Sequence, residues 1–185
     1  MSWEWISAKT ISGSIRTQEP IPRPISPSFH PIASAWFTHV EFRKAISHCI
    51  NREESSVMFS GASGGDLWPD IATNTEWYNP DIPKFEYDLD AARRILDSLQ
   101  FIDRNGDGIR EDPQGNPIEF TFITNRENGI RERMGNIIQE SFKEAGLNGR
   151  MKLVDFNTLV TAIADSFDYE ACLLGLTGSD YPFRA

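Results

Sequence analysis

The pattern of apolar and polar positions changes near residue 38. From Phe42 onward, apolar side chains recur every three or four residues, which places them along one face of an α-helix. The stripe consists of Phe42, Ala45, Ile46, Cys49 and Ile50. Thr38 and Glu41 fit a capping box, so this helix is predicted to begin there. A shorter helix is predicted over about residues 52–60, with Gly61 ending it.

Residues 61–88 are predicted to be rich in loops, because glycines and prolines interrupt every apolar run. Several aromatic residues lie between these interruptions, and a long loop of this composition has to pack on the rest of the fold. Asp88 or Asp90 is placed to cap the next helix, which is about ten residues long. Its inward positions are Ala91, Ile95, Leu96 and Leu99.

The second half of the chain alternates between strand and helix patterns. Strands are predicted over 118–124, 151–155 and 169–176, and the last is nearly continuous in apolar residues, as a buried central strand is. A long helix is predicted from Glu127 to Ala145, and a second one, capped by Asp155 or Asn157, ends near residue 165. This order predicts βαβ units with right-handed crossovers, and the fold class is therefore α/β.

Residues 1–35 differ from the rest of the chain. They contain five prolines and many serines and threonines, and prolines exclude regular helix through most of this stretch. We expect residues 1–35 to form an extended arm or linker and residues 36–185 to form the folded domain. Cys49 and Cys172 both fall in apolar elements and are expected to be free buried thiols, although the sequence leaves a disulfide open.

Charge and motif content exclude several classes of function. The chain has 18 basic and 27 acidic residues, a net charge of −9, which argues against binding to a phosphate backbone. No apolar run reaches the length of about 18 residues that crosses a bilayer, and the N-terminus lacks the features of a signal peptide. Neither the three histidines nor the Gly61–Gly65 stretch matches a catalytic triad, a zinc site or a phosphate loop. We expect no enzyme activity and no cofactor.

The acidic turn at residues 103–114 admits two interpretations. Asp103, Asn105 and Asp107 occupy positions 1, 3 and 5 of a calcium loop, and Glu111 falls at position 9. Position 12 is Gln114, so the strongest charged ligand of such a loop is replaced by a neutral side chain. The favoured interpretation is an Asx-type turn whose side chains hold their own backbone, with weak calcium binding as the alternative.

Five segments, in order over about residues 36–181, resemble a known family. They begin with Trp36-Phe37 and the Phe42–Glu53 helix, and continue through the Tyr87–Leu99 helix and the Asp103–Pro117 turn. The last two run from Phe122 to Glu132 and from Asp155 to Gly178. Together they are similar to the family 5 solute-binding proteins, which serve oligopeptide, dipeptide and nickel ABC importers. Asn51 departs from the pattern, since the family usually has aspartate there.

The resemblance implies a fold and a setting. It implies part of the C-terminal lobe of a type II periplasmic binding protein, with a mixed, mostly parallel sheet flanked by helices. Proteins of this kind close two lobes on a solute and deliver it to a membrane permease. The chain resembles only part of one lobe, so the N-terminal lobe is expected to be missing. The intact protein is expected to be periplasmic or membrane-associated outside the cytoplasm.

The resemblance also implies ligand-binding residues. A carboxylate after the last apolar strand pairs with the free amino group of a peptide, and the matching residue here is Asp180. The carboxyl ends of strands in α/β sheets are where ligands usually bind. Trp68, Trp77 and Tyr78 lie in a segment that often borders the cleft, although they can equally pin the loop to the core.

Three functions follow from these observations. The first is a transport receptor lobe that binds peptides or another small solute. The second is a shortened remnant that binds no solute and instead associates with itself through surface that the missing lobe leaves exposed. The third is a calcium-binding module that uses residues 103–114.

Overall fold

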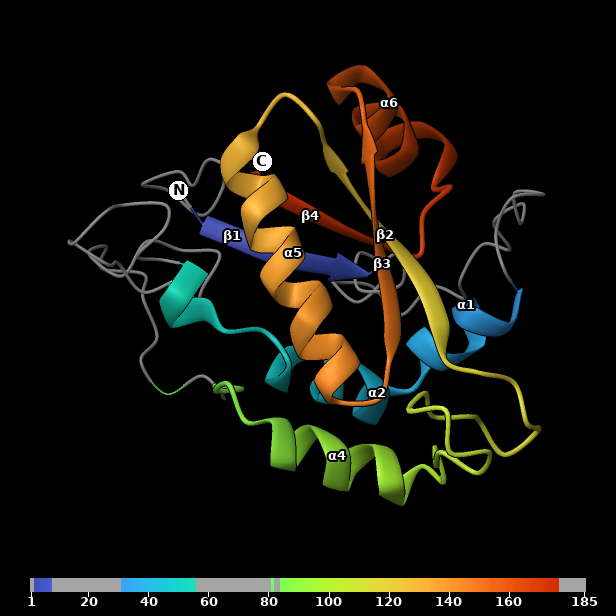
Figure 1. The fold of residues 1–185 in the computed structure, drawn as a ribbon. Helices are drawn as coiled ribbons and strands as arrows, with labels where there is room; N and C mark the ends of the chain where they lie inside the picture. Colours follow the sequence, from blue (N-terminus) through green and yellow to red (C-terminus); the bar gives the residue numbers. More distant parts are fainter. Residues whose placement is uncertain (1, 8–30, 56–80, 82–83, 177–185) are drawn as a thin grey trace.

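The computed structural model describes residues 2–7, 31–55, 81 and 84–176. Its centre is a four-stranded sheet in the order β1-β4-β2-β3 (Figure 1). The strands are β1 (Ser2–Ser7), β2 (Glu119–Asn125), β3 (Asn148–Val154) and β4 (Ala171–Leu176). Strands β2, β3 and β4 are parallel to one another, and β1 joins β4 in the antiparallel direction. The expected mixed, mostly parallel sheet of an α/β fold is therefore confirmed.

Helix α5 (Gly129–Glu144) connects β2 to β3 and covers one face of the sheet (Figure 1). Asn128 caps it by accepting the N–H groups of Ile130 and Arg131, and Gly146, at φ +83°, follows its end in the left-handed conformation. Buried Met134, Ile138 and Phe142 pack into the main core. The opposite face carries α6 (Phe156–Thr161) and a π-helical turn (Ala162–Ser166), which cover Ile123, Val154 and Cys172.

A second layer of helices packs beneath the amino ends of β2 and β3. It contains α1 (Pro31–Thr38), α2 (Val40–His48) and α4 (Leu89–Ser98), and a helical turn at residues 52–55 extends it. Edge-to-face aromatic contacts join this layer to the sheet: Phe37, Phe42 and Phe142 surround Phe120, with centroids 5.3 to 6.4 Å from its ring. Such pairs add to the stabilisation from burial alone.

The first part of the chain differs from its expected form. Residues 2–7 form β1, paired with β4 along its whole length, and α1 already begins at Pro31. Proline is well tolerated at the first position of a helix, because the N–H that proline lacks would have no acceptor within the helix at that position. The described parts of residues 1–35 are thus regular structure, and the division of the chain at residue 35 remains a prediction.

The capping box predicted at Thr38 and Glu41 is wrong. Thr38 ends α1, and its hydroxyl donates to the carbonyl of Ala35 at 2.5 Å. Helix α2 begins after His39, which makes no side-chain cap, and Glu41 instead pairs with Lys44 at 2.7 Å. Because α1 extends through Thr38, the extended N-cap geometry falls at His39 instead, and the box has no Ser or Thr side chain at that position.

Other local predictions are confirmed. Asp88 caps α4 by accepting the N–H of Ala91 at 2.8 Å, and Asp155 caps α6 by accepting that of Thr158 at 2.9 Å. Both cysteines are free and buried, and burial raises the pKa of Cys49 to about 12, partly offset by Arg93. A thiol with this pKa stays protonated and unreactive at neutral pH. Within the described residues, no helix has the length and apolar character needed to span a bilayer.

Candidate functional site

The four ligand residues expected from the sequence lie outside the described residues. These are Asp180, Trp68, Trp77 and Tyr78. The structure does describe the strand that leads to Asp180, since β4 runs to Leu176. The carboxyl edge of the sheet, where β4 ends, is therefore the described part of the expected site.

The chain leaves the carboxyl ends of β2 and β3 in opposite directions. After β2 it crosses one face of the sheet in α5, and after β3 it crosses the other face in α6. Where neighbouring connections diverge in this way, a crevice opens at the strand ends, and ligands of open α/β sheets bind there. Asn125 is the last residue of β2, and Asp155 directly follows the end of β3.

Strand β4 separates from β2 soon after the two strands meet. They pair only at Phe122 with Ala171 and at Ile123 with Cys172, whereas β2 and β3 stay paired over seven positions. Beyond Cys172 the Thr124 hydroxyl donates to the Leu173 carbonyl at 2.9 Å, where a backbone bond would continue the ladder. In Figure 1, β4 and β1 run at a steep angle to β2 and β3.

Because of this divergence, no described strand lies beside the backbone groups of β4 that face the β2 side beyond Leu173. Successive residues of a strand direct their backbone groups to opposite edges. Because the Leu173 carbonyl is directed toward β2, the N–H and carbonyl of Gly175 are directed the same way. Gly175 lies past the last residue of β4 that pairs with β2.

A polar network holds the end of β2 in place. The buried Asn125 accepts a 2.5 Å hydrogen bond from the Arg131 guanidinium and donates to Glu127 at 3.0 Å. The other Glu127 oxygen accepts the N–H of Phe156 at 3.3 Å, which links the connections that follow β2 and β3. Burial lowers the pKa of Arg131, which nevertheless stays cationic at neutral pH. The sequence indicated these residues only by their place after a predicted strand.

Hydrogen bonds also favour the ionised carboxylates at this edge. A bond from its own backbone N–H, followed by one from Asn125, holds the pKa of Glu127 below its usual value. The hydroxyl and N–H of Thr158 do the same for the pKa of Asp155. The carboxyl edge thus carries fixed negative charge beside the half-buried Arg131, a setting that can orient a charged solute.

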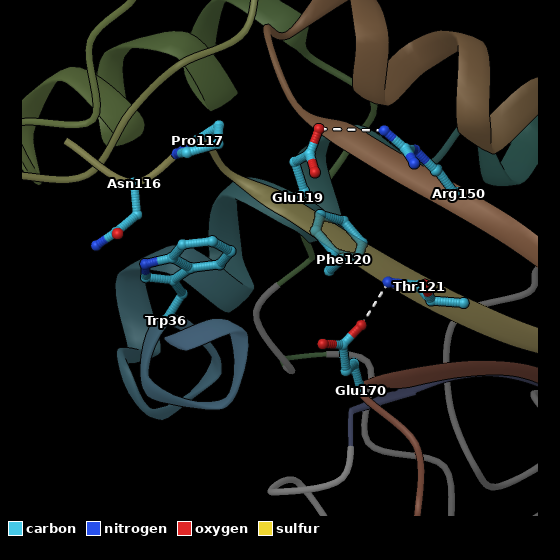
Figure 2. A pocket seen from close by; sticks show the side chains of 8 residues that line it. All are labelled: Trp36, Asn116, Pro117, Glu119, Phe120, Thr121, Arg150 and Glu170. Atoms are coloured by element: carbon cyan, nitrogen blue, oxygen red, sulfur yellow. Dashed lines mark hydrogen bonds and ion pairs between the residues drawn. The ribbon is translucent and has the colours of Figure 1, made fainter. Parts of the chain in front are cut away.

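A separate pocket of about 290 Å³ lies at the amino end of β2 (Figure 2). Its walls include the Trp36 indole and the Phe120 ring, and an ion pair between Arg150 and Glu119 at 3.1 Å lies on its rim. Glu170 accepts the backbone N–H of Thr121 at 2.5 Å, just before β4 begins to pair with β2. This pocket is at the opposite end of the strands from the expected solute site.

The sequence matches a known family over most of its length. Residues 10–184 match the family of bacterial extracellular solute-binding proteins, family 5, middle region. This chain belongs to that family. The resemblance inferred from five short segments is therefore confirmed, and family 5 proteins are the solute-binding components of ABC importers.

Two curated relatives support the assignment to family 5. A probable ABC transporter-binding protein of Deinococcus radiodurans is 31% identical over 148 residues, which are 77% of this chain and 25% of the relative. The oligopeptide-binding protein AppA of Bacillus subtilis is 30% identical over 151 residues, which are 79% of this chain and 27% of AppA. The chain spans about a quarter of the length of each of these family 5 relatives.

Solved structures show the same fold. AppA in complex with a nonapeptide matches with a TM-score of 0.66 and 26% identity, over 80% of this chain and 30% of AppA. An oligopeptide-binding protein of Thermotoga maritima with bound mannohexaose matches with a TM-score of 0.67 and 26% identity, over 78% and 28% of the two chains. These solved proteins carry solutes of different chemistry, a peptide and a sugar.

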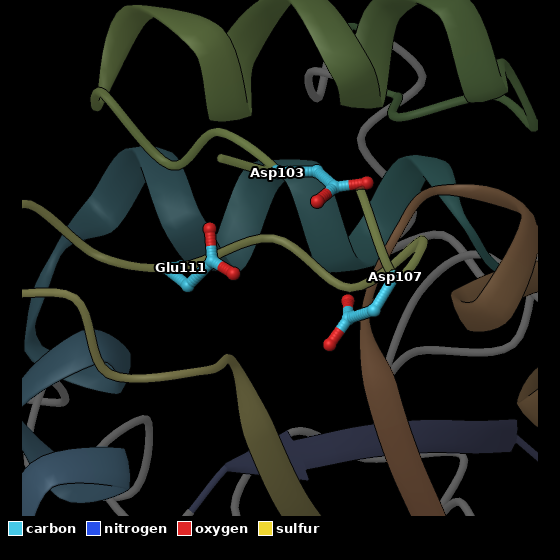
Figure 3. Close-up of side chains that lie close together, drawn as sticks. All are labelled: Asp103, Asp107 and Glu111. Carbon is cyan, nitrogen blue, oxygen red and sulfur yellow. The ribbon is translucent and has the colours of Figure 1, made fainter. Parts of the chain in front are cut away.

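The acidic turn of this family 5 chain brings three carboxylates together (Figure 3). Oxygens of Asp103, Asp107 and Glu111 lie within 4.8 Å of one another. Both Asp103 oxygens already accept backbone N–H groups, those of Gly106 at 2.7 Å and Gly108 at 2.9 Å. These are the bonds of the expected Asx-type turn, and the two glycines adopt positive φ angles of +81° and +89°.

The remaining side chains of the turn are bonded in the same manner. Asn105 accepts the N–H of Asp107 at 2.8 Å, and Asp107 accepts that of Ile109 at 2.8 Å. Glu111 accepts the N–H of Arg104 at 2.8 Å. The turn is held by its own hydrogen bonds, and calcium binding by Asp103, Asn105 and Asp107 stays a prediction.

Proposed function

We propose that this chain forms one wall of a peptide-binding cleft in the receptor of an ABC importer, at the carboxyl edge of its sheet. The observation that carries the proposal is the separation of β4 from β2 after two paired positions. Past Leu173, whose carbonyl is already bonded to Thr124, the backbone of Gly175 then offers a main-chain donor and acceptor beside a strand end. An extended peptide can use such groups whatever its side chains are, as in strand addition.

Asp180 is proposed as the partner of the peptide's free amino group. It follows β4 closely in sequence, and the ends of strands in this fold class are the usual place for ligands. A buried ammonium group needs a carboxylate partner, because an unpaired buried charge is strongly destabilised. Trp68, Trp77 and Tyr78 are proposed to border the same cleft.

The complete binding site is proposed to form only in a protein longer than this chain. The chain spans about a quarter of its curated relatives, and closure of two lobes around the solute is proposed for the longer protein. Delivery to a membrane permease is proposed for the same closed form. The name of AppA, an oligopeptide-binding protein, supports peptides as the solute class, and the mannohexaose bound to the Thermotoga maritima protein supports sugars as a second class.

Calorimetry on a longer protein that contains this sequence tests the proposal. A pool of peptides with free amino ends is expected to bind, and the same pool after N-acetylation is expected to bind at least tenfold more weakly. Asp180→Asn is expected to weaken binding of the free peptides by roughly 30-fold or more, since truncating a buried charge pair costs about 2 kcal/mol or more. Asp165→Asn, an exposed acid on the π-helical turn, is the matched control and is expected to bind normally.

The outcomes separate the solute classes. Binding of mannohexaose with no response to peptides would make the solute a sugar and refute the peptide proposal. Equal binding of free and acetylated peptides would leave a peptide site but remove the role of Asp180. No binding of either solute by the longer protein would favour the remnant that binds no solute.

A further inference from the structure

Strand β3 is one edge of the described sheet, and it has an open side. The N–H of Asn148 donates to the carbonyl of Ile118, and the carbonyl of Val154 accepts the N–H of Arg126. Ile118 and Arg126 flank β2, so the backbone groups of every second residue of β3, from Asn148 to Val154, are directed toward β2. Gly149, Met151 and Leu153 are therefore directed outward. A strand edge with unpaired outward groups is a template for pairing with another chain.

The central outward group of β3 is occupied by a side chain from α5. The backbone N–H of Met151 donates to the Gln139 side-chain oxygen at 2.9 Å. The outward carbonyl of Leu153 accepts a longer bond, 3.3 Å, from the Arg126 guanidinium. No described residue bonds to the N–H of Leu153.

The close approach of α5 to β3 is what allows Gln139 to reach the edge. Gly135 lies one helical turn before Gln139, and a Cβ atom at Gly135 would clash with the Met151 sulfur. A larger residue at position 135 would require the flexible Met151 side chain to shift. The glycine thus leaves room for the Met151 side chain beneath α5, and the glutamine bonds to the strand edge.

Charge adds a second barrier to pairing. In an antiparallel pair of two β3 strands centred on Met151, Arg150 of one copy would lie opposite Lys152 of the other. Both side chains are exposed, and like charges at directly opposed positions disfavour a strand pair. The only acid bonded to Arg150 in the described structure is Glu119, which is on β2 of the same chain.

We propose that Gln139 closes the outer edge of β3 against strand pairing with a second copy of this chain. The bond to Met151 removes the central donor from the edge, and the Arg150 and Lys152 charges oppose the pairing that the remaining groups would allow. This assignment does not depend on the identity of the solute. Removal of the Gln139 side-chain acceptor is expected to expose the Met151 amide. Removal of that acceptor together with reversal of the Lys152 charge is expected to produce dimers.

Amide hydrogen exchange of this 185-residue chain, followed by NMR, tests the hydrogen bond between Gln139 and the Met151 amide directly. In the wild-type chain the Met151 amide is expected to exchange at least tenfold more slowly than the equally outward Leu153 amide. Gln139→Leu removes the acceptor and is expected to accelerate Met151 roughly tenfold, while Gln139→Glu keeps an acceptor and is expected to leave it protected. Equal exchange of Met151 and Leu153 in the wild-type chain overturns the proposal, even where the leucine variant does not fold.

Sedimentation velocity over a concentration series tests the consequence. The wild-type chain and Gln139→Glu are expected to show no dimer formed through β3. The double variant Gln139→Leu with Lys152→Glu is expected to form dimers, because the introduced carboxylate of one copy would then oppose Arg150 of the other. Addition of Leu153→Pro, which suits an edge but blocks pairing, is expected to abolish those dimers. A double variant that remains monomeric and folded, or dimers that survive the proline, would overturn the proposal.

Discussion

At the scale of single residues, the buried pair of Trp36 and Asp112 best shows how the fold is held together. The indole N–H of Trp36 donates to Asp112 at 3.1 Å across 76 residues of sequence. Asp112 also accepts the N–H groups of Gln114 and Asn116, both at 2.9 Å. Burial by itself raises the pKa of Asp112, but hydrogen bonds from Asn116, Trp36 and Gln114 outweigh it and hold the pKa below its usual value.

Substitutions at this pair are expected to destabilise the chain unequally. Trp36→Phe removes one donor and should cost about 1 kcal/mol of unfolding free energy, while Asp112→Ala leaves one buried and several half-buried donors without their acceptor and should cost roughly 3 kcal/mol. Urea unfolding of both variants measures the difference. An Asp112→Ala variant no less stable than Trp36→Phe would contradict this interpretation.

Asp112 also predicts a dependence of stability on pH. Its folded pKa is depressed, so its contribution is fully present above the unfolded pKa of about 3.9 and is lost as the pH falls through the lower folded value. Thermal melting between pH 7 and pH 3 is expected to show a smaller loss of stability in Asp112→Asn than in the wild type. Identical pH profiles would show that Asp112 does not contribute.

At the scale of elements, the packing of α5 on the sheet depends on small residues. A Cβ atom at Gly149 of β3 would come within 2.5 Å of the Phe142 ring and 2.9 Å of the Phe120 ring. Both rings are buried, and the Phe142 ring belongs to α5, so neither can move without disturbing the core. The sequence showed Gly149 only as a glycine near a predicted strand.

Alanine at two glycines is expected to have opposite effects. Gly149→Ala should destabilise the chain by about 1–3 kcal/mol through overpacking. Gly129→Ala is the control and is expected to stabilise the chain slightly. Nothing lies within 4 Å of its added Cβ, and the residue begins α5, where alanine is the better helix former. Denaturant unfolding measures both, and equal effects would show that the close approach at Gly149 does not limit the fold.

The sequence predicted elements well where their signal is local. Asp88 and Asp155 cap the helices that follow them, because a cap needs only an acceptor and the next few N–H groups. The Thr38 capping box fails because α1 continues up to Thr38, an outcome set by the packing of Trp36 and Phe37 in the core. Local patterns cannot report such contacts with distant residues.

At the scale of the whole molecule, the divergence of β4 from β2 organises the candidate site. It places main-chain groups at the carboxyl edge, while the pocket beside Trp36 and the acidic turn lie elsewhere in the fold. The proposed solute site and the acidic turn of the calcium alternative therefore lie in different parts of the molecule. Each can be tested without disturbing the other.

Calcium provides the whole-molecule test of the third function. The hydrogen bonds of the 103–114 turn already satisfy its carboxylates, so a calcium titration is expected to leave the thermal midpoint of the chain unchanged within about 1 °C. Calorimetric melting with and without millimolar calcium measures this. A clear rise that Asp107→Asn abolishes would support the calcium-binding module instead.

By itself, the sequence determined the α/β class, the order of the elements from residue 118 to 176 and the family, and it included Asp88 and Asp155 among its cap candidates. These features depend on residue spacing within one element or on ordered segments along the chain. Only the tertiary structure decided that residues 2–7 pair with β4, that β4 leaves β2 after Cys172, and that Gln139 reaches Met151. Each of these joins residues distant in sequence or on separate elements, and no periodicity specifies such a partner, because the partner is chosen by the packing of the whole core.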